Sequence, residues 1–198
     1  MKTINEVCIM WAIDPGIAMT EDKKCHNLEK LRSPERMALL EVERVVQLTL
    51  EGCVADSILD IGTGSGLFAE AFSQLGLEVA GIDEQEKMLT AARSFVPGGE
   101  FRIASAESLP FSDASFDLGF LGHVLHESEI PLLVLQEARR VCQRRVAVLE
   151  WPFQEEAEGP PRSHRLKSDE VLNYASEAGF KHSQEIRLKH MVLFLLDQ

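Results

Sequence analysis

Apolar positions change their spacing repeatedly along this chain, and the changes predict alternating strands and helices. Short apolar runs predict strands at residues 57–61, 78–83, 100–103, 116–121 and 145–149. Between and after these runs, apolar side chains recur at helical spacing and predict helices at residues 67–75, 85–95, 131–142 and 168–178. Helices that alternate with apolar strands are typical of a parallel sheet covered on both faces. The pattern therefore predicts an α/β fold with a Rossmann-like doubly wound sheet that is mostly parallel.

The two ends of the chain depart from this alternation. Two strand-like runs at residues 181–188 and 190–195 have no helix between them, so we expect an antiparallel C-terminal hairpin at the sheet edge. Residues 1–32 show no clear period and contain a turn at Asp14-Pro15-Gly16, and we expect them to form an N-terminal extension or lid. Ser33-Pro34 then predicts the start of a helix that continues to Gly52. We assign residues 33–198 to one domain.

The composition limits the classes of partner. The chain has 198 residues, of which 45% are hydrophobic, and a formal net charge of −12. Because an acidic chain repels phosphate backbones, we expect a small-molecule substrate and no nucleic acid. No apolar run approaches the roughly 18 residues that a membrane span needs, and the N-terminus lacks the apolar core of a signal peptide. We therefore expect a cytoplasmic protein without a membrane span, and the sequence leaves its oligomeric state open.

A glycine-rich loop follows the first predicted strand. Its sequence is Asp60-Ile61-Gly62-Thr63-Gly64-Ser65-Gly66, and it leads directly into a predicted helix. Glycine permits positive φ and lets a ligand approach the main chain, while free N–H groups at a helix start attract carboxylate or ribose oxygens. A dinucleotide loop has the spacing G-x-G-x-x-G, but Leu67 occupies the place of its third glycine. The loop therefore indicates a nucleoside ligand that has no pyrophosphate.

An acidic residue ends the second predicted strand. Asp83 follows the loop by about twenty residues, where a carboxylate can accept hydrogen bonds from both hydroxyls of a ribose. The same side chain could cap the helix at residues 85–95, and the adjacent Glu84 would also suit that position. The two interpretations are compatible, and the spacing from the glycine loop favours ribose binding.

These segments together resemble the class I S-adenosylmethionine-dependent methyltransferases. The resemblance rests on residues 59–66, 81–83, 104–111 and 115–117, and further on residues 124–127, 149–151, 159–161 and 178–180. It covers about residues 33–198, and the most similar subgroup is the small-molecule enzymes akin to the ubiquinone/menaquinone-biosynthesis methyltransferases. The resemblance implies S-adenosyl-L-methionine as cofactor and methyl transfer to a small-molecule acceptor by in-line displacement.

The resemblance also implies which residues bind the cofactor. Asp60 and the glycine loop would hold its amino-acid end, Asp83 its ribose, and Met88 its adenine. The N–H of Ala106 would reach the adenine, and the main chain at the end of the fourth strand would meet the methionine end. The candidates are Asp60, Gly62, Thr63, Gly64, Gly66, Asp83, Glu84, Met88, Ser105, Ala106, Glu107, Leu121 and Gly122.

The chain departs from the family pattern at two places. Ser105 stands where the family usually has an Asp that accepts a hydrogen bond from the adenine amino group. Serine can still accept such a bond but brings no charge. Gln143-Arg144 replaces the Pro-Gly-Gly that usually precedes the fifth strand, and we interpret this change as structural.

Three polar residues near the fourth and fifth strand ends are candidates for catalysis. His123, His126 and Glu150 could deprotonate an acceptor, because His titrates near neutral pH and Glu150 follows the fifth strand. The two histidines could equally line the cofactor pocket. Trp151 could pack on a substrate or in the core. We predict no metal site, because no third ligand accompanies the histidines and the four cysteines are far apart.

Three functions remain open from the sequence. The leading one is a methyltransferase that acts on a small molecule. The second is a catalytically silent cofactor-binding regulatory or partner subunit, in view of Ser105 and the lack of an evident base. The third is a nicotinamide oxidoreductase, which Leu67 argues against.

Overall fold

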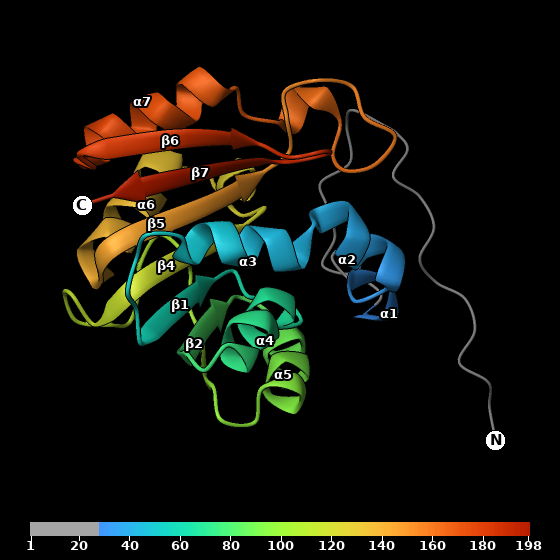
Figure 1. The fold of residues 1–198 in the computed structure, drawn as a ribbon, viewed down its shortest axis with the longest axis vertical. Helices are drawn as coiled ribbons and strands as arrows, with labels where there is room; N and C mark the ends of the chain where they lie inside the picture. Colours follow the sequence, from blue (N-terminus) through green and yellow to red (C-terminus); the bar gives the residue numbers. More distant parts are fainter. Residues whose placement is uncertain (1–27) are drawn as a thin grey trace.

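The computed structural model describes residues 28–198, which contain a single seven-stranded sheet (Figure 1). The strands are β1 (Ser57–Ile61), β2 (Glu78–Asp83), β3 (Glu100–Ile103), β4 (Phe116–Gly122), β5 (Cys142–Glu150), β6 (His182–Arg187) and β7 (Val192–Asp197). Their order in the sheet is β3-β2-β1-β4-β5-β7-β6, and the first five are parallel. Strand β7 runs antiparallel to both β5 and β6. The predicted fold class and its C-terminal edge hairpin are thus confirmed.

The helices alternate with the parallel strands as the apolar spacing predicts. They are α1 (Leu28–Leu31), α2 (Pro34–Leu40), α3 (Val42–Leu50), α4 (Leu67–Gln74), α5 (Glu86–Phe95), α6 (Pro131–Val141) and α7 (Ser168–Ala178), with short 3-10 helices η2 (Leu125–Glu127) and η3 (Arg162–His164). The predicted strands and helices lie within a few residues of the observed ones, except at the first helix.

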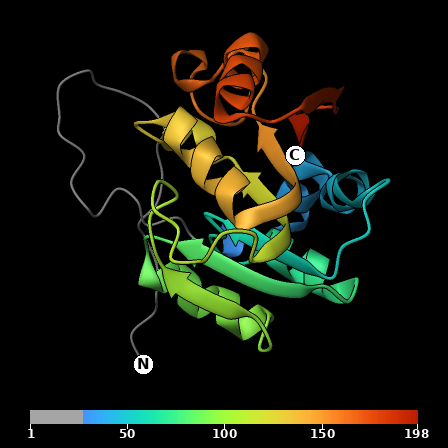
Figure 2. The same ribbon diagram turned by 90° about the vertical axis from the view of Figure 1, so that its left-hand side faces the viewer.

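Two apolar cores form on the two faces of the sheet. Ile58 of β1 packs with residues of α3, α4 and α5 on one face. Leu59 and Ile61 point to the other face, where α6 and α7 cover them. Figure 2 shows α6 (gold) packed beside the C-terminal elements (orange and red). Because consecutive strand residues alternate between the two cores, both faces of the sheet are buried. A ligand can therefore reach the sheet only where the strands end.

The single helix predicted from Ser33 to Gly52 is wrong, because the chain breaks it at Glu41. Ser33 does cap α2, accepting a hydrogen bond from the N–H of Arg36 at 3.2 Å. Glu41, however, has a φ of 48°, which ends α2 and starts α3 in a new direction. Its carboxylate accepts hydrogen bonds from the N–H of Lys189 at 2.7 Å and from Arg44 at 2.9 Å. A contact from the far C-terminal hairpin thus fixes a break that local spacing does not signal.

Most of the predicted extension or lid at residues 1–32 lies outside the described residues, and only α1 and Arg32 of this stretch are described. In the part of the chain that the structure describes, no helix is both long and apolar enough to cross a membrane.

Candidate functional site

The carboxyl ends of four parallel strands meet along one edge of the sheet. In the order β2-β1-β4-β5, they bring Asp83, the glycine loop, Gly122 and Glu150 next to one another. The chain continues from β1 to β2 and β3 on one side and then returns to place β4 on the other side of β1. Ligands of open α/β sheets bind at such a reversal of strand order. The candidate site therefore lies above β1 and β4.

The glycines of the loop differ in what surrounds them. A Cβ at Gly62, where φ is 69°, would overlap Cγ2 of Val124 in the segment after β4. A Cβ at Gly66 would lie 2.9 Å from Cα of Ala92, so this glycine lets α4 approach α5. Gly64 has a φ of 54° and nothing within 4 Å of its Cβ position. Of the loop, Gly64 is therefore the position with room for a ligand against the main chain.

Asp60 lies buried beneath the loop and is 2% exposed. Its carboxylate accepts a hydrogen bond from the Thr63 hydroxyl at 2.7 Å and another from the N–H of Ala69 in α4. Burial raises the pKa of Asp60 to about 7, although both hydrogen bonds oppose the rise. Asp60 and Thr63 thus brace the loop from below, and a cationic ligand above them would favour the ionised carboxylate.

Asp83 bridges the loop and the start of α5. Its two carboxylate oxygens accept hydrogen bonds from the N–H of Gly64 at 3.0 Å and from the N–H of Gln85 at 2.8 Å. Gln85 is the N-cap of α5, so Asp83 makes the contact at the helix start that one of the two interpretations predicts, while ribose binding stays a prediction. Glu84 is exposed in the same turn. A carboxylate has about four lone-pair sites and can accept several hydrogen bonds at once, which is the property that ribose binding requires.

The remaining cofactor candidates lie in α5, at the end of β4 and in the loop after β3. Met88 is buried in α5, and Leu121 is buried at the end of β4. A Cβ on Gly122 would lie 3.1 Å from the Phe120 ring, a tight contact, and 3.5 Å from the Phe68 ring. Ser105 and Ala106 are partly buried in the loop after β3.

Glu107 has contacts that the sequence does not reveal. The Ser128 hydroxyl donates to its carboxylate at 2.7 Å and the N–H of Ile130 at 3.3 Å. The bond from Ser128 is the main reason that the pKa of Glu107 is lowered. The Ser105 hydroxyl in turn accepts from the N–H of Glu107 at 3.3 Å. These bonds tie the loop after β3 to the start of α6.

Arg32 is a site residue that sequence reasoning missed. Its guanidinium donates to the carbonyl of Ser65 at 2.9 Å, forms an ion pair with Glu70 of α4, and lies 3.6 Å from the centroid of the Phe95 ring. Its side chain is 12% exposed. Arg32 therefore attaches the segment before α2 to the glycine loop. No motif or spacing in the sequence links Arg32 to Ser65. The only signal was its position in a stretch for which no helix or strand is predicted.

His126 and Glu150 form a close pair at the ends of β4 and β5. Nδ1 of His126 lies 2.7 Å from Oε2 of Glu150, and the N–H of His126 donates to Oε1 at 3.1 Å. The two side chains are 7% and 3% exposed. Burial lowers the pKa of His126, but the hydrogen bond and charge of Glu150 outweigh it, so the pKa is raised. The structure thus brings together two of the three residues proposed for catalysis.

His123 lies in a different environment. Its backbone has a φ of 62° and its N–H donates to the Leu149 carbonyl at 2.9 Å. Its Nε2 is 3.3 Å from the sulfur of Met191, and its ring lies 5.2 Å from that of Trp151 at an angle of 30°. Burial lowers the pKa of His123 well below its ordinary value, and the charge of Arg36 adds to this. The His123 ring therefore packs against Trp151.

Trp151 is 4% exposed and lies under the loop that follows β5. A Cβ on Gly159 would lie 2.6 Å from the Trp151 ring. Arg165, 5% exposed, donates to the carbonyls of Pro152, Gln154, Glu158 and Pro160 at 2.8–3.2 Å. Arg165 therefore organises residues 152–165 over Trp151, and this packing corresponds to the core interpretation of the tryptophan.

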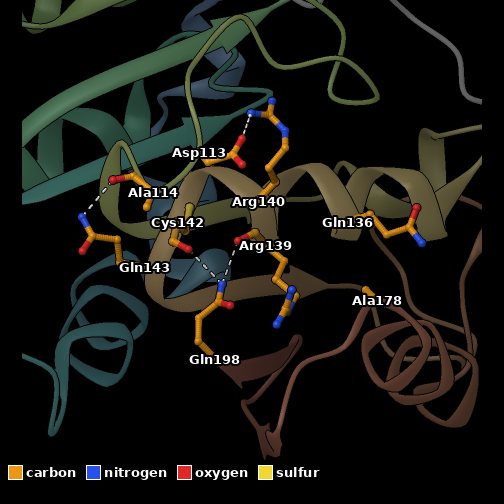
Figure 3. Close-up of a pocket in the computed structure, with 9 residues that line it drawn as sticks. All are labelled: Asp113, Ala114, Gln136, Arg139, Arg140, Cys142, Gln143, Ala178 and Gln198. Carbon is orange, nitrogen blue, oxygen red and sulfur yellow. Dashed lines mark hydrogen bonds and ion pairs between the residues drawn. The ribbon is translucent and has the colours of Figure 1, made fainter.

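A pocket of about 610 Å³ lies at the opposite end of the sheet (Figure 3). Cys142 in its wall is the first residue of β5 and pairs with Phe116, the first residue of β4. Gln198 there donates to the carbonyls of Arg139 and Cys142, both at 2.9 Å, and Gln143 to that of Ala114. These bonds hold the C-terminus to α6. The pocket is thus at the amino ends of the strands, away from the candidate site.

Fold and site define an α/β protein of the Rossmann-like type, with carboxylates at the ends of β1 and β2. Among residues 28–198, no cluster of three or more His, Cys, Asp or Glu side chains could hold a metal. The glycine loop and the open position at Gly64 fit a nucleoside cofactor.

Comparisons with known proteins agree with this class. A protein-family model described as "Methyltransferase domain" matches residues 59–149. A demethylmenaquinone methyltransferase of Thermotoga maritima is 37% identical over 112 residues, 54% of this chain and 48% of the relative. An uncharacterized methyltransferase of Bacillus subtilis, YcgJ, is 32% identical over 123 residues, 60% of this chain and 49% of the relative. The chain thus matches about half the length of these two relatives.

A solved structure extends the match beyond the family model. The crystal structure of a SAM-dependent methyltransferase from Aquifex aeolicus superposes with a TM-score of 0.78 and 26% identity, covering 86% of this chain and 96% of that one. Residues 59–149 thus match a methyltransferase domain, and over 86% of its length the chain is similar in sequence and fold to a SAM-dependent methyltransferase.

Proposed function

We propose that this protein transfers a methyl group from S-adenosylmethionine to a small-molecule acceptor by in-line displacement. The observation that carries the proposal is the arrangement around Gly64. This residue has open space at its Cβ position, its N–H is held by Asp83, and the buried Asp60 lies beneath the same loop. When bound, the cofactor supplies an activated methyl group on a positively charged sulfur.

The residues divide into two halves along the strand ends. Asp60, Gly64 and Asp83 on β1 and β2 would hold the amino-acid and ribose parts of the cofactor. His126 of η2 and Glu150 of β5 would face the acceptor. Since displacement at a methyl group depends mainly on alignment and exclusion of water, the protein needs to hold the acceptor close more than to activate the methyl group.

Four further predictions accompany this function. The name of the Thermotoga maritima relative supports a small-molecule acceptor. The exclusion of nucleic acid rests on the net charge of −12, and the cytoplasmic location rests on the sequence alone. Residues 1–32 as a lid remain a proposal, which the attachment of Arg32 to the glycine loop supports.

Calorimetric titration with S-adenosylhomocysteine tests the proposal. The wild-type protein should bind it, and Asp83→Asn should weaken binding by about 10- to 100-fold, because a charged hydrogen bond is worth about 1.5–3 kcal/mol. Glu86→Gln is the matched control: this exposed carboxylate of α5 pairs with Arg93 and should leave the affinity unchanged. Absence of binding to the wild-type protein would refute the proposed function.

A further inference from the structure

The position of His126 follows from two contacts at the ends of β4 and β5. Val124, two residues before it, packs directly on Gly62 of the glycine loop. Glu150 at the end of β5 contacts both the ring and the backbone N–H of His126. The segment that carries His126 therefore starts at the glycine loop, and the imidazole itself is held by the fifth strand.

The hydrogen bond to Glu150 orients the imidazole of His126. A carboxylate can only accept hydrogen bonds, so Nδ1 carries the proton and Nε2 keeps its lone pair when the ring is neutral. Among residues 28–198 no buried side-chain nitrogen or oxygen lacks a partner, and Nε2 of His126 makes no hydrogen bond there. Nε2 is therefore the ring nitrogen that reaches the surface.

Glu150 is itself held in place. Besides the two bonds from His126, its Oε2 accepts from the N–H of Trp151 at 3.3 Å. The other groups that act on His126 are Glu127 on its own turn, Arg165 from the loop after β5, and His123. Glu127 favours the protonated ring and Arg165 opposes it. His123 is not equivalent to His126, because its Nε2 contacts Met191 and its ring lies against Trp151.

We infer that His126, oriented by Glu150, accepts the proton of a methyl acceptor that reacts through a phenolic or enolic hydroxyl group. This inference rests on the proposed function. Nε2 takes the proton as the O–H bond breaks, and the oxygen forms its bond to the methyl carbon. The methyl–sulfur bond breaks and its electron pair stays on sulfur, giving S-adenosylhomocysteine. The imidazolium, stabilised by the Glu150 carboxylate, then returns its proton to solvent.

The pair of His126 and Glu150 favours a phenolic or enolic acceptor because of the pKa of the acceptor group. A thiol with a pKa near 8.5 is already ionised to a few per cent at pH 7, whereas a phenol with a pKa near 10 is ionised to about one part in a thousand. A phenol or enol therefore gains more than a thiol from a neighbouring base, typically 10²- to 10⁴-fold in rate. Glu150 is a positioning residue, since it acts through His126.

The first test measures the protonation of His126 in the absence of any acceptor. Diethyl pyrocarbonate acylates neutral imidazole, and peptide mass mapping across pH 5–9 gives the modification rate of each histidine. The pKa of His126 in the wild-type protein should lie above the ordinary value of a histidine, and the exposed His182 of β6 serves as the reference for changes between variants. Glu150→Gln should move the His126 profile to lower pH and leave that of His182 in place. An unchanged His126 profile in Glu150→Gln would overturn the role of Glu150.

The second test measures transfer from radiolabelled S-adenosylmethionine to four probes: catechol, a naphthohydroquinone, cyclohexylamine and 2-mercaptoethanol. We expect the label on one or both hydroxyl probes. His126→Gln should lower kcat by 10²- to 10⁴-fold with KM changed by less than about three-fold, while His182→Gln keeps the wild-type rate. Glu150→Gln should lower kcat less and shift the acid limb of the pH–rate profile.

Calorimetry with S-adenosylhomocysteine separates the two levels of the proposal and reports whether each variant is folded. Both His126→Gln and Glu150→Gln should bind within about three-fold of the wild type, because the pair lies on the acceptor half. Binding without label on either hydroxyl probe would overturn the acceptor class. Wild-type transfer by a His126→Gln variant that binds normally would overturn the role of His126. If the wild-type protein does not bind S-adenosylhomocysteine, the proposed function itself is refuted.

Discussion

Asp60 shows at the scale of one residue how a binding site can reduce stability. Its pKa is about 7 in the folded protein and near 3.9 in an unfolded chain. The folded state therefore binds more protons between these values, and stability should fall as pH rises from about 4 to 7 and then level off. Asp60→Asn should remove roughly 2–4 kcal/mol of this pH dependence. Urea unfolding of the wild type and of Asp60→Asn at pH 5 and pH 8 measures this difference. If the free energy of unfolding changed equally with pH in both proteins, Asp60 would be ionised in the folded state.

Arg32 makes a second prediction for a single side chain. Arg32→Lys keeps the charge but loses the planar group that bridges Ser65, Glu70 and Phe95. We expect it to destabilise the protein by about 1–2 kcal/mol and to weaken S-adenosylhomocysteine binding several-fold, because the glycine loop loses a brace. Arg44→Lys is the control, since Arg44 makes an exposed ion pair with Glu41. Denaturant unfolding and calorimetry of the two variants should separate them; similar values would exclude a role of Arg32 in the loop.

The glycine loop makes a prediction at the scale of an element. Ala at Gly62 would overlap Val124, whereas Ala at Gly64 would meet open space and bear only the cost of its positive φ. That cost is roughly 1–2 kcal/mol. Gly62→Ala should therefore unfold at a clearly lower temperature than Gly64→Ala. Gly64→Ala should keep most of its stability but lose most of its affinity for S-adenosylhomocysteine; if it bound normally, the ligand would not approach the loop there.

The elements also show what a sequence pattern can and cannot predict. Strands and helices were predictable where each buries a regular apolar face, as in β2 and α5. The hairpin of β6 and β7 was predictable because no helix separates its apolar runs. The break at Glu41 was not, because Lys189, 148 residues away, helps to fix it. In the site, Asp60, Asp83 and the glycines follow from spacing along the chain, whereas the pairing of His126 with Glu150 and the contacts of Arg32 depend on tertiary packing.

At the scale of the whole molecule, the sheet edge should behave as two nearly independent halves. The cofactor half depends on β1 and β2, and the acceptor half depends on the pair between η2 and β5. A ligand that binds only the folded state stabilises it by about 2.7 kcal/mol at 100 times its Kd, which is roughly 5–10 °C for a chain of this size. S-adenosylhomocysteine at that fixed concentration should thus raise the Tm of the wild type and of His126→Gln alike. Asp83→Asn should lose at least half of the shift.

The double variant tests this independence directly. Distant sites that share no partner contribute additively, so Asp83→Asn combined with His126→Gln should show the ligand shift of Asp83→Asn alone. Differential scanning calorimetry with and without S-adenosylhomocysteine gives all four shifts, and Glu86→Gln supplies the control. If His126→Gln changed the ligand shift as much as Asp83→Asn does, the halves would be coupled. The contact between Val124 and Gly62 would then be the path, because it is where the segment before His126 touches the glycine loop.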